Sequence, residues 1–346
     1  MEKWVDLRRD TITLPTPEMK EAAFRASLGD SVYGEDSEQR ELEELAARVL
    51  DKEEAIFVPS GTMGNLIAVL SHTERGNEII LEQWAHIRTS ETGGSALVGG
   101  IMMNPVPGPR GVPEIKELEA AIRPDNIHYP RTALVCLESS HYRYGGIVAP
   151  LEDMRQIREV TNKYCLPIHL DGARLFNAAL YLGVAGKDLA RLADSVMVSL
   201  SKGLGSPVGS ILAGEKSFIT RAKRYRKLLG GGMRQTGWLC ACGRIALSPS
   251  NIARLEDDHR RARILAEGLN SISGVTVNLS RVHTNFVLAD LRGSGIQSET
   301  FLSLLRERKI LATFVDDWTI RMVTSRQVND EDIEHTLFAA EEIIKK

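Results

Sequence analysis

Two apolar segments in the middle of the sequence each end in a charged residue. The first, residues 166–171, ends at Asp171, and the second, residues 195–202, ends at Lys202. A helical stretch over residues 174–192 separates them, so the sequence predicts a β-α-β unit whose strands are parallel neighbours. The carboxylate and the amine are then expected at the same edge of the sheet, outside the carboxyl ends of the strands, where open α/β sheets bind ligands.

A carboxylate and an amine at one such edge suggest a pyridoxal phosphate site. The Lys202 amine would bond covalently to the cofactor, and Asp171 would keep the ring nitrogen protonated, which turns the ring into an acceptor of electrons. Taken alone, a lysine before a glycine is usually a solvated charge, and an Asp-Gly pair is usually a turn. The small residues of Ser201–Ser210 favour the cofactor interpretation, because they let a flat ring approach the backbone.

The phosphate of such a cofactor needs a third contact at the same edge. The apolar segment 55–58 breaks at Ser60, Gly61 and Thr62 and then continues as an apolar helical stretch. Free backbone amides and the positive end of the helix dipole suit a phosphate, although many turns of this kind are only helix caps. Together with the amine and the carboxylate, this turn completes the three contacts that the cofactor requires.

The elements around these residues predict an α/β fold. From about residue 16 to residue 247, short apolar runs alternate with helical periods, which is typical of a mostly parallel sheet covered by helices. After residue 250, an amphipathic helix over 251–272 leads into a smaller α+β part. We therefore expect a large cofactor-binding domain over 1–250, whose first segment, 1–15, contributes to the active site, and a small domain over 251–346. The other elements predicted in the small domain are strands over 275–278, 285–290 and 319–323, a helix over 299–308, and a last helix capped near Asn329.

Composition excludes several classes of protein. With 346 residues and a net charge of −3, the chain is unlike an overall nucleic-acid or membrane-surface binder. It has no apolar leader and no segment of membrane-spanning length, so we expect a cytoplasmic protein. Gly293-Ser294-Gly295 lacks the third glycine of the dinucleotide fingerprint, which disfavours a nicotinamide enzyme. We expect no metal site and no disulfide framework, because the cysteines are few and scattered: Cys136, Cys165, Cys240 and Cys242.

Short motifs spread over nearly the whole chain carry a further signal. They are Asp6-Leu7-Arg8, Asp10-Thr11, Gly29-Asp30, Val32 to Asp36, Pro59 to Thr62, Asp171 to Arg174, Leu200 to Leu204, Gly230 to Gln235 and Ile320 to Thr324. In this order they resemble the threonine aldolase family. That family belongs to the fold type I pyridoxal phosphate enzymes, which include the aspartate aminotransferases, and the resemblance implies the same fold.

The resemblance implies a role for each matching residue. Lys202 would bond to the cofactor, Asp171 would contact the pyridine nitrogen, and His86 would stack on the ring. Family members work as dimers of active sites, usually in tetramers, so the protein is expected to be a homo-oligomer. Ser60, Gly61 and Thr62 would form the turn that binds the phosphate. Arg174 would lie beside the cofactor and, together with Arg321, would bind the substrate carboxylate. A neighbouring subunit would contribute Arg234, which binds the phosphate, and Tyr33, which lies near the substrate.

The resemblance also implies the reaction. With the carboxylate fixed, the bond perpendicular to the ring is Cα–Cβ, and removal of the β-hydroxyl proton would cleave L-threonine, L-allo-threonine or a related β-hydroxy-α-amino acid to glycine and an aldehyde. His86 and His141 are the candidates for that base or for positioning a water that acts as one, and the alternative for each is a packing or hydrogen-bonding role. The competing functions are β-elimination or racemisation on the same cofactor, and a non-catalytic member that keeps the fold for assembly.

Three positions depart from the family pattern, all of them toward the substrate. Arg9 stands where the family has a serine, Glu138–Tyr142 replaces Glu-Asn-Thr-His-Asn, and Ser325 stands where a histidine is common. We hypothesise that Arg9 binds the substrate by adding a cation near the Cβ substituent, which would favour a second acidic group, as in a β-hydroxyaspartate. The alternative is that Arg9 points to solvent or pairs with a local acid.

Overall fold

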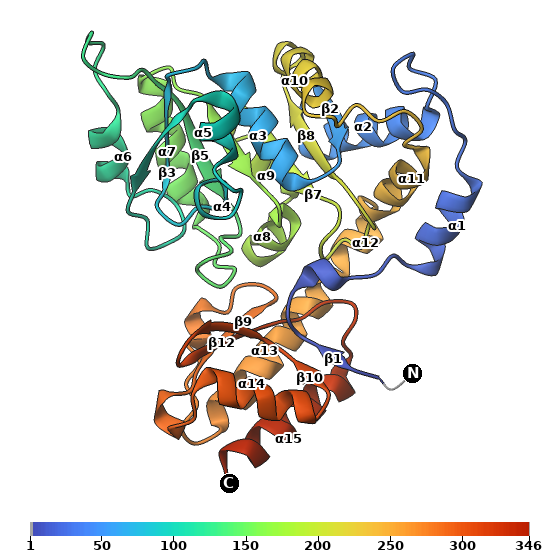
Figure 1. The fold of residues 1–346 in the computed structure, drawn as a ribbon, viewed down its shortest axis with the longest axis vertical. Coiled ribbons are helices and arrows are strands. Elements are labelled where there is room, and N and C mark those ends of the chain that lie inside the picture. Colours follow the sequence, from blue (N-terminus) through green and yellow to red (C-terminus); the bar gives the residue numbers. More distant parts are fainter. Residues whose placement is uncertain (1–2, 346) are drawn as a thin grey trace.

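The computed structural model describes residues 3–345 and has two parts (Figure 1). The larger part contains a seven-stranded sheet between helices, and the smaller part, drawn in orange and red, contains a three-stranded sheet with helices packed against it. Residues 1–2 and 346, which fall within the predicted domain ranges, lie outside the described residues. The predicted class, a mostly parallel α/β sheet with a smaller α+β part, is confirmed.

The large sheet has a parallel core and two further strands at one edge. In spatial order its strands are β2 (Glu54–Val58), β8 (Ser210–Gly214), β7 (Ser195–Ser199), β6 (Ile168–Asp171), β5 (Thr132–Glu138), β3 (Glu78–Glu82) and β4 (Met102–Val106). The five strands from β7 to β4 are parallel, and β8 runs antiparallel to both β7 and β2. The carboxyl end of β2 therefore lies at the same edge as those of β6 and β7.

Helices cover both faces of this sheet. They are α1 (Pro17–Arg25), α2 (Ser37–Leu50), α3 (Gly61–His72), α4 (His86–Thr89), α5 (Gly94–Gly99), α6 (Ile115–Ala121), α7 (Leu151–Lys163), α8 (Leu175–Leu182), α9 (Gly186–Ala190), α10 (Lys216–Leu228) and α11 (Gly237–Ala246). In β7, Val196 and Val198 pack in the core that contains α2, α7 and α8, whereas Met197 packs against α3 and α10 on the opposite face. The strands are apolar on both sides because both faces are buried.

The smaller part combines both ends of the chain. Strand β12 (Thr319–Val323) lies between the antiparallel strands β9 (Phe286–Asp290) and β11 (Thr313–Asp316). Its helices are α13 (Leu255–Ser271), α14 (Ser298–Glu307) and α15 (Asp330–Ile344); the short α12 (Pro249–Ala253) precedes them and packs through Ile252 against the core of the larger part. Near the N-terminus, β1 (Val5–Asp6) pairs with β10 (Ile310–Leu311), and Val5 and Leu7 are buried in the core of the smaller part. The first residues therefore pack with the C-terminal part, although the sequence places all of 1–250 in the large domain.

The predicted β-α-β unit is present with different bounds. Its strands β6 and β7 are parallel neighbours, as expected. The strand predicted over 195–202 ends at Ser199, so Lys202 lies in the loop that follows. The helix predicted over 174–192 is two helices, because α8 ends at Leu182 and the φ of 65° at the following Gly183 turns the backbone out of the helix.

The elements predicted in the smaller part differ at two places. The helix over 251–272 is divided into α12 and α13, and the segment 275–278 forms only an isolated bridge at Thr276. The last helix begins after Asn329, whose side chain accepts a hydrogen bond from the amide of Asp332, which confirms the predicted cap. No helix within residues 3–345 is long and apolar enough to cross a membrane.

Candidate active site

The amine and the carboxylate lie at the same edge of the sheet. Asp171 is the buried last residue of β6, and Lys202 follows the neighbouring parallel strand β7. Burial and the positive charge of Arg174 lower the pKa of Lys202 to about 8, against the opposing charges of Asp10 and Asp171. Among residues 3–345, no side chain or carbonyl accepts a hydrogen bond from Lys202 Nζ. A lysine with a lowered pKa and a free amine is suited to act as a nucleophile.

The Asp171 carboxylate is held by two donors from the protein. Asn65 Nδ2 donates to Oδ2 at 2.8 Å, and the Ala173 amide donates to Oδ1 at 3.1 Å. These two hydrogen bonds fix the orientation of the carboxylate. A carboxylate fixed at this edge fits the protonated ring nitrogen of pyridoxal phosphate.

The predicted phosphate turn lies at the carboxyl end of β2 and begins α3. Ser60 caps the helix, because its Oγ accepts a hydrogen bond from the Met63 amide at 3.2 Å. Within the described part of the chain, the amides of Gly61 and Thr62 have no acceptor. A Cβ on Gly61 would lie 3.1 Å from Met197, so glycine allows the start of the helix to pack close to β7. Two free amides at the N-terminus of a 12-residue helix fit a phosphate group.

Arg234 and Tyr33 lie at the protein surface. Their side chains are exposed, and Arg234 forms an ion pair with Asp30 at 2.7 Å. No hydrogen bond or ion pair among residues 3–345 joins either side chain to the amine or the carboxylate described above. One chain therefore does not bring these two residues into the site, and their predicted action across a subunit interface stays a prediction.

His86 begins α4 and is joined to the same carboxylate network. Its Nδ1 lies 2.8 Å from Glu91 Oε1, and its amide donates to Glu138 Oε2 at 2.7 Å. Burial opposes protonation, but the hydrogen bond to Glu91 and the charges of Asp171, Glu91 and Glu138 together raise the pKa of His86. One ring nitrogen of His86 and one carboxylate oxygen each of Glu91 and Asp171 lie within 4.8 Å of one another. His86 therefore lies close to Asp171, the residue that is predicted to contact the pyridine nitrogen.

His141 lies deeper in the protein than the predicted role requires. The side chain is fully buried, its Nε2 lies 2.9 Å from Glu82 Oε2, and its Nδ1 has no partner. Burial opposes protonation, but the charges of Glu138 and Glu82 and the hydrogen bond to Glu82 raise the pKa of His141. A fully buried imidazole whose Nε2 is engaged by a carboxylate is poorly placed to take a proton from a substrate. The position therefore favours the packing and hydrogen-bonding alternative for His141 over the base.

Two buried arginines meet at the other side of the site. Arg174 donates from Nε and Nη2 to the buried Asp10 at 2.6 and 2.7 Å. The guanidinium of Arg321 stacks on the Tyr142 ring at 4.6 Å from its centroid, and its Nε has no partner. Burial, and the charges of Arg9 and Arg174, lower the pKa of Arg321. Among residues 3–345, Asp10 is the one ion-pair partner of this cationic cluster of Arg9, Arg174 and Arg321, which is therefore suited to bind an anion.

Several residues that hold the site together had no role in the sequence prediction. Asp10 lies in a matching motif, but nothing local shows that it pairs with Arg174, 164 residues away. Asn65 carries a usable signal, because it lies one helical turn after Gly61 and so shares a face with the phosphate turn. Glu91 lies in a loop, and no sequence pattern connects it with His86.

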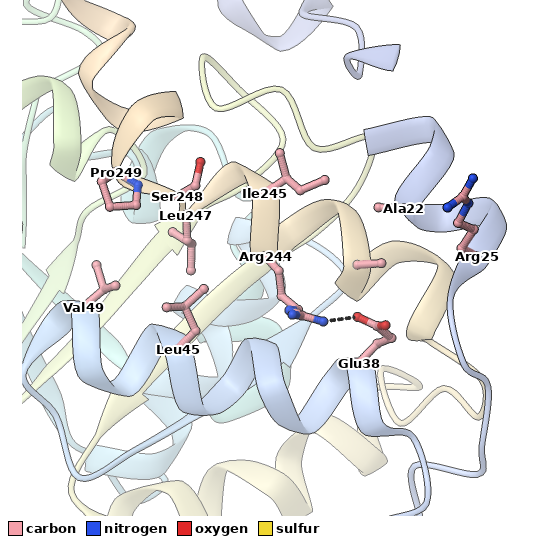
Figure 2. Close-up of a pocket in the computed structure, with 11 residues that line it drawn as sticks. Ala22, Arg25, Glu38, Leu45, Val49, Arg244, Ile245, Leu247, Ser248 and Pro249 are labelled. Carbon is pink, nitrogen blue, oxygen red and sulfur yellow. Dashed lines mark hydrogen bonds and ion pairs between the residues drawn. The ribbon is translucent and has the colours of Figure 1, made fainter. Parts of the chain in front are cut away.

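A cavity of about 530 Å³ lies elsewhere, between α1, α2, α11 and the start of α12 (Figure 2). Its lining includes Leu45, Val49 and Leu247, and one ion pair joins Arg244 and Glu38 at 2.7 Å. None of the predicted site residues lines it. Its walls offer no nucleophile beside a base, so the chemistry is assigned to the edge of the sheet.

Comparison with known proteins decides the family. The family model for the beta-eliminating lyases matches residues 6–292. The chain belongs to this family. Within the family it is 44% identical over 338 residues to low-specificity L-threonine aldolase 1 of Arabidopsis thaliana, covering 96% of this chain and 94% of that protein. It is 40% identical over 330 residues to the low specificity L-threonine aldolase of Escherichia coli strain K12, covering 95% of this chain and 96% of that protein.

Solved structures share the fold of this family member. The threonine aldolase of Leishmania major superposes with a TM-score of 0.86 at 20% identity, covering 98% of this chain and 99% of that chain. The serine palmitoyltransferase of Sphingomonas wittichii gives a TM-score of 0.78 at 16% identity, covering 99% of this chain and 87% of that chain. The predicted resemblance to the threonine aldolases and to fold type I is confirmed. The chain is a carbon–carbon lyase whose cofactor is pyridoxal phosphate.

Proposed function

We propose that this enzyme cleaves L-threonine, L-allo-threonine or a related β-hydroxy-α-amino acid between Cα and Cβ, giving glycine and an aldehyde. The observation that carries the proposal is the free Lys202 amine of lowered pKa at the same sheet edge as Asp171. The named relatives with 40–44% identity, which are low-specificity L-threonine aldolases, support the substrate class. β-Elimination and racemisation are the alternatives that the product assay below separates.

The cofactor end would be held by four groups. Lys202 would provide the covalent anchor, Asp171 would hold the proton on the pyridine nitrogen, and the free amides of Gly61 and Thr62 would bind the phosphate. When bound, the cofactor accepts the electron pair of the bond that breaks. The protein's part is to keep these anchors in place before the substrate arrives.

The substrate carboxylate would be bound mainly by Arg321. Two of the donor nitrogens of Arg174 are already committed to Asp10, whereas Arg321 has no acidic partner among the described residues. The Tyr142 ring beneath the guanidinium limits its movement. A fixed carboxylate sets the orientation of the Cα–Cβ bond, which selects the bond that is cleaved.

His86 would remove the proton from the β-hydroxyl group, directly or through a water. Its Nδ1 is engaged by Glu91, which leaves Nε2 of the neutral ring as the acceptor. After the transfer, Glu91 stabilises the charged ring. His141 would only support the Glu82 and Glu138 side of the site, because it is buried.

A product assay tests the proposal. The purified enzyme with pyridoxal phosphate is incubated with L-threonine and with L-allo-threonine, and glycine, acetaldehyde, ammonia, keto acid and D-threonine are measured. We expect glycine and acetaldehyde in equal amounts. Ammonia with a keto acid would establish β-elimination instead, and D-threonine would establish racemisation.

We also propose that Arg9 selects substrates with a second acidic group, such as a β-hydroxyaspartate. The Arg9 side chain is exposed, has no acidic partner within residues 3–345, and places its charge on the same cluster as Arg321. The test compares turnover of threonine and β-hydroxyaspartate by the wild type and by Arg9→Ser. We expect the substitution to shift the ratio toward threonine, and an unchanged ratio would contradict the proposal.

We further propose a cytoplasmic homotetramer with active sites shared between subunits. Phe24 and Tyr33 are 79% and 77% exposed, which suits an interface, and all four cysteines are free, which suits a reducing compartment. Lys202→Ala and Arg234→Ala subunits would each be inactive, but their mixture would contain hybrids with one intact site. Recovery of activity on mixing is expected. No recovery, or a monomer in light scattering, would contradict sharing.

A further inference from the structure

A chain of buried polar side chains crosses the sheet behind Asp171. His169 and Ser195 lie opposite each other on β6 and β7, and His169 Nδ1 is 2.9 Å from Ser195 Oγ. Asn65 Oδ1 lies 3.1 Å from His169 Nε2, and His72 Nε2 lies 2.8 Å from Ser195 Oγ. Asn65 and His72 are seven residues apart on α3, so they face the sheet together and the chain joins the helix to both strands.

In this chain of hydrogen bonds, the Asn65 amide has only one orientation in which every donor faces an acceptor. Its Nδ2 lies 2.8 Å from both Glu91 Oε1 and Asp171 Oδ2. Carboxylate oxygens accept, so the amide nitrogen must face them and the amide oxygen must face His169. The opposite orientation would place an amide oxygen against two carboxylates.

The direction then follows along the rest of the chain. Because Asn65 Oδ1 only accepts, His169 Nε2 carries the proton, and the unprotonated Nδ1 accepts from the Ser195 hydroxyl. That hydroxyl has given its only hydrogen, so it accepts from His72 Nε2. Burial lowers the pKa of His169 to about 4 and that of His72 to about 3, so both rings are neutral, as this assignment requires.

These hydrogen-bonded polar side chains lie in an otherwise apolar layer between α3 and the sheet. Its neighbours on this face of the sheet are apolar, including Ile67, Ala68 and Met197, and unpaired polar groups there would be unfavourable. Each polar hydrogen of these side chains is donated to the next acceptor along the series, and the last acceptors are the carboxylates of Asp171 and Glu91. The arrangement serves the two carboxylates, one at the expected ring nitrogen and one behind His86.

We propose that Asn65, His169 and Ser195 are positioning residues that hold the Asp171 carboxylate correctly oriented for the pyridine nitrogen. Asn65 also couples this carboxylate to the Glu91–His86 pair through its second hydrogen. The proposal rests on the cofactor site and not on the substrate, so it stands or falls separately from the aldol cleavage.

The test measures the dissociation constant of pyridoxal phosphate for the cofactor-free full chain by absorbance titration. His169→Leu removes the donor to Asn65, whereas the amide of His169→Gln can replace it. We expect His169→Leu to weaken cofactor binding at least about tenfold and His169→Gln to stay within about threefold of the wild type. The matched control is His259→Leu, which removes a partly buried histidine of lowered pKa, bonded to Asn177, and is expected to leave the constant unchanged.

A double-mutant cycle separates positioning from general damage to the fold. In an Asp171→Asn background, His169→Leu should change the dissociation constant less than about twofold, because the carboxylate that it supports is gone. An equal loss in both backgrounds, or no loss in the wild-type background, would overturn the proposal. If melting of the cofactor-free form shows that His169→Leu is unfolded, Ser195→Ala takes its place, with an expected weakening of about threefold that must also vanish with Asp171→Asn.

Discussion

The cofactor end and the substrate end of the site are built in opposite ways. At the cofactor end, Asn65 joins Asp171 and Glu91 through hydrogen bonds of 2.8 Å. At the substrate end, Arg9 and Arg321 have no acidic partner among residues 3–345. A fully paired polar network specifies one geometry, whereas unpaired cations are stabilised only when an anion binds.

This difference explains where the chain departs from its family. Arg9 and Tyr142, two of the positions predicted to depart from the family pattern, lie beside Arg321, whereas Lys202 and Asp171 are predicted to match it. A change in the paired network would leave a buried polar group without a partner. A change among the cations only alters which anion fits. Substrate choice can therefore vary on a cofactor site that stays the same.

Removal of Lys202 should break the cofactor end completely. We expect Lys202→Ala to lower kcat/KM at least about a thousandfold, because the covalent anchor has no substitute at this edge. Borohydride reduction followed by mass spectrometry should find the cofactor attached to Lys202 in the wild type and to no residue in the variant. Lys187→Ala, an exposed lysine on α9, is the control and should match the wild type. A variant with a tenth of the normal activity would contradict the assignment.

His86 connects the two ends and should control the pH dependence. Its raised pKa keeps the ring protonated below a midpoint above 6.5, so kcat should rise as the pH increases through that midpoint. Glu91→Gln removes the hydrogen-bonding carboxylate and should move the midpoint down. His86→Phe should lower kcat about a hundredfold. The measurement is kcat against pH, and a midpoint that Glu91→Gln leaves in place would exclude His86 as the base.

Arg321 tests whether the substrate end is a separate binding site for a carboxylate. Arg321→Gln should raise KM about tenfold or more and change kcat much less, because the guanidinium binds a group that does not react. Arg326→Gln is a matched control, since Arg326 is another partly buried arginine with a lowered pKa, here bonded to Asn251. Equal effects of the two substitutions on KM would show only general damage to the smaller part.

Tyr142 should give the smallest effect and sharpen the comparison most. Tyr142→Asn restores the residue of the family pattern and removes the ring beneath Arg321, and we expect KM to rise about threefold to fivefold. Tyr142→Phe keeps the ring and should stay close to the wild type. Steady-state kinetics with L-threonine decide between them. If the two variants behave alike, stacking on Arg321 is not what Tyr142 contributes.

Local patterns explain which parts of the site could be predicted. The apolar run before Asp171 correctly marked the end of β6, whereas the run before Lys202 was placed three residues too far, since β7 ends at Ser199. The turn at Ser60 was predicted as a phosphate contact, with a helix cap as the alternative; its Oγ does cap α3, and the phosphate contact stays a prediction. His141 stays a predicted candidate, because its burial and its contact with Glu82, 59 residues away, cannot be read from local sequence.

The sequence by itself determined the alternation of strands and helices, the residues at the strand ends and the turn that begins α3. These follow from interactions between residues a few positions apart, which the order of the chain fixes. Only the tertiary structure decided that Asn65 donates a hydrogen bond to Asp171 and that Asp10 forms an ion pair with Arg174. These two pairs are separated by 106 and 164 residues in the sequence. Such pairs depend on which polar groups are buried together, and burial is a property of the folded whole, because it exists only after distant segments have packed.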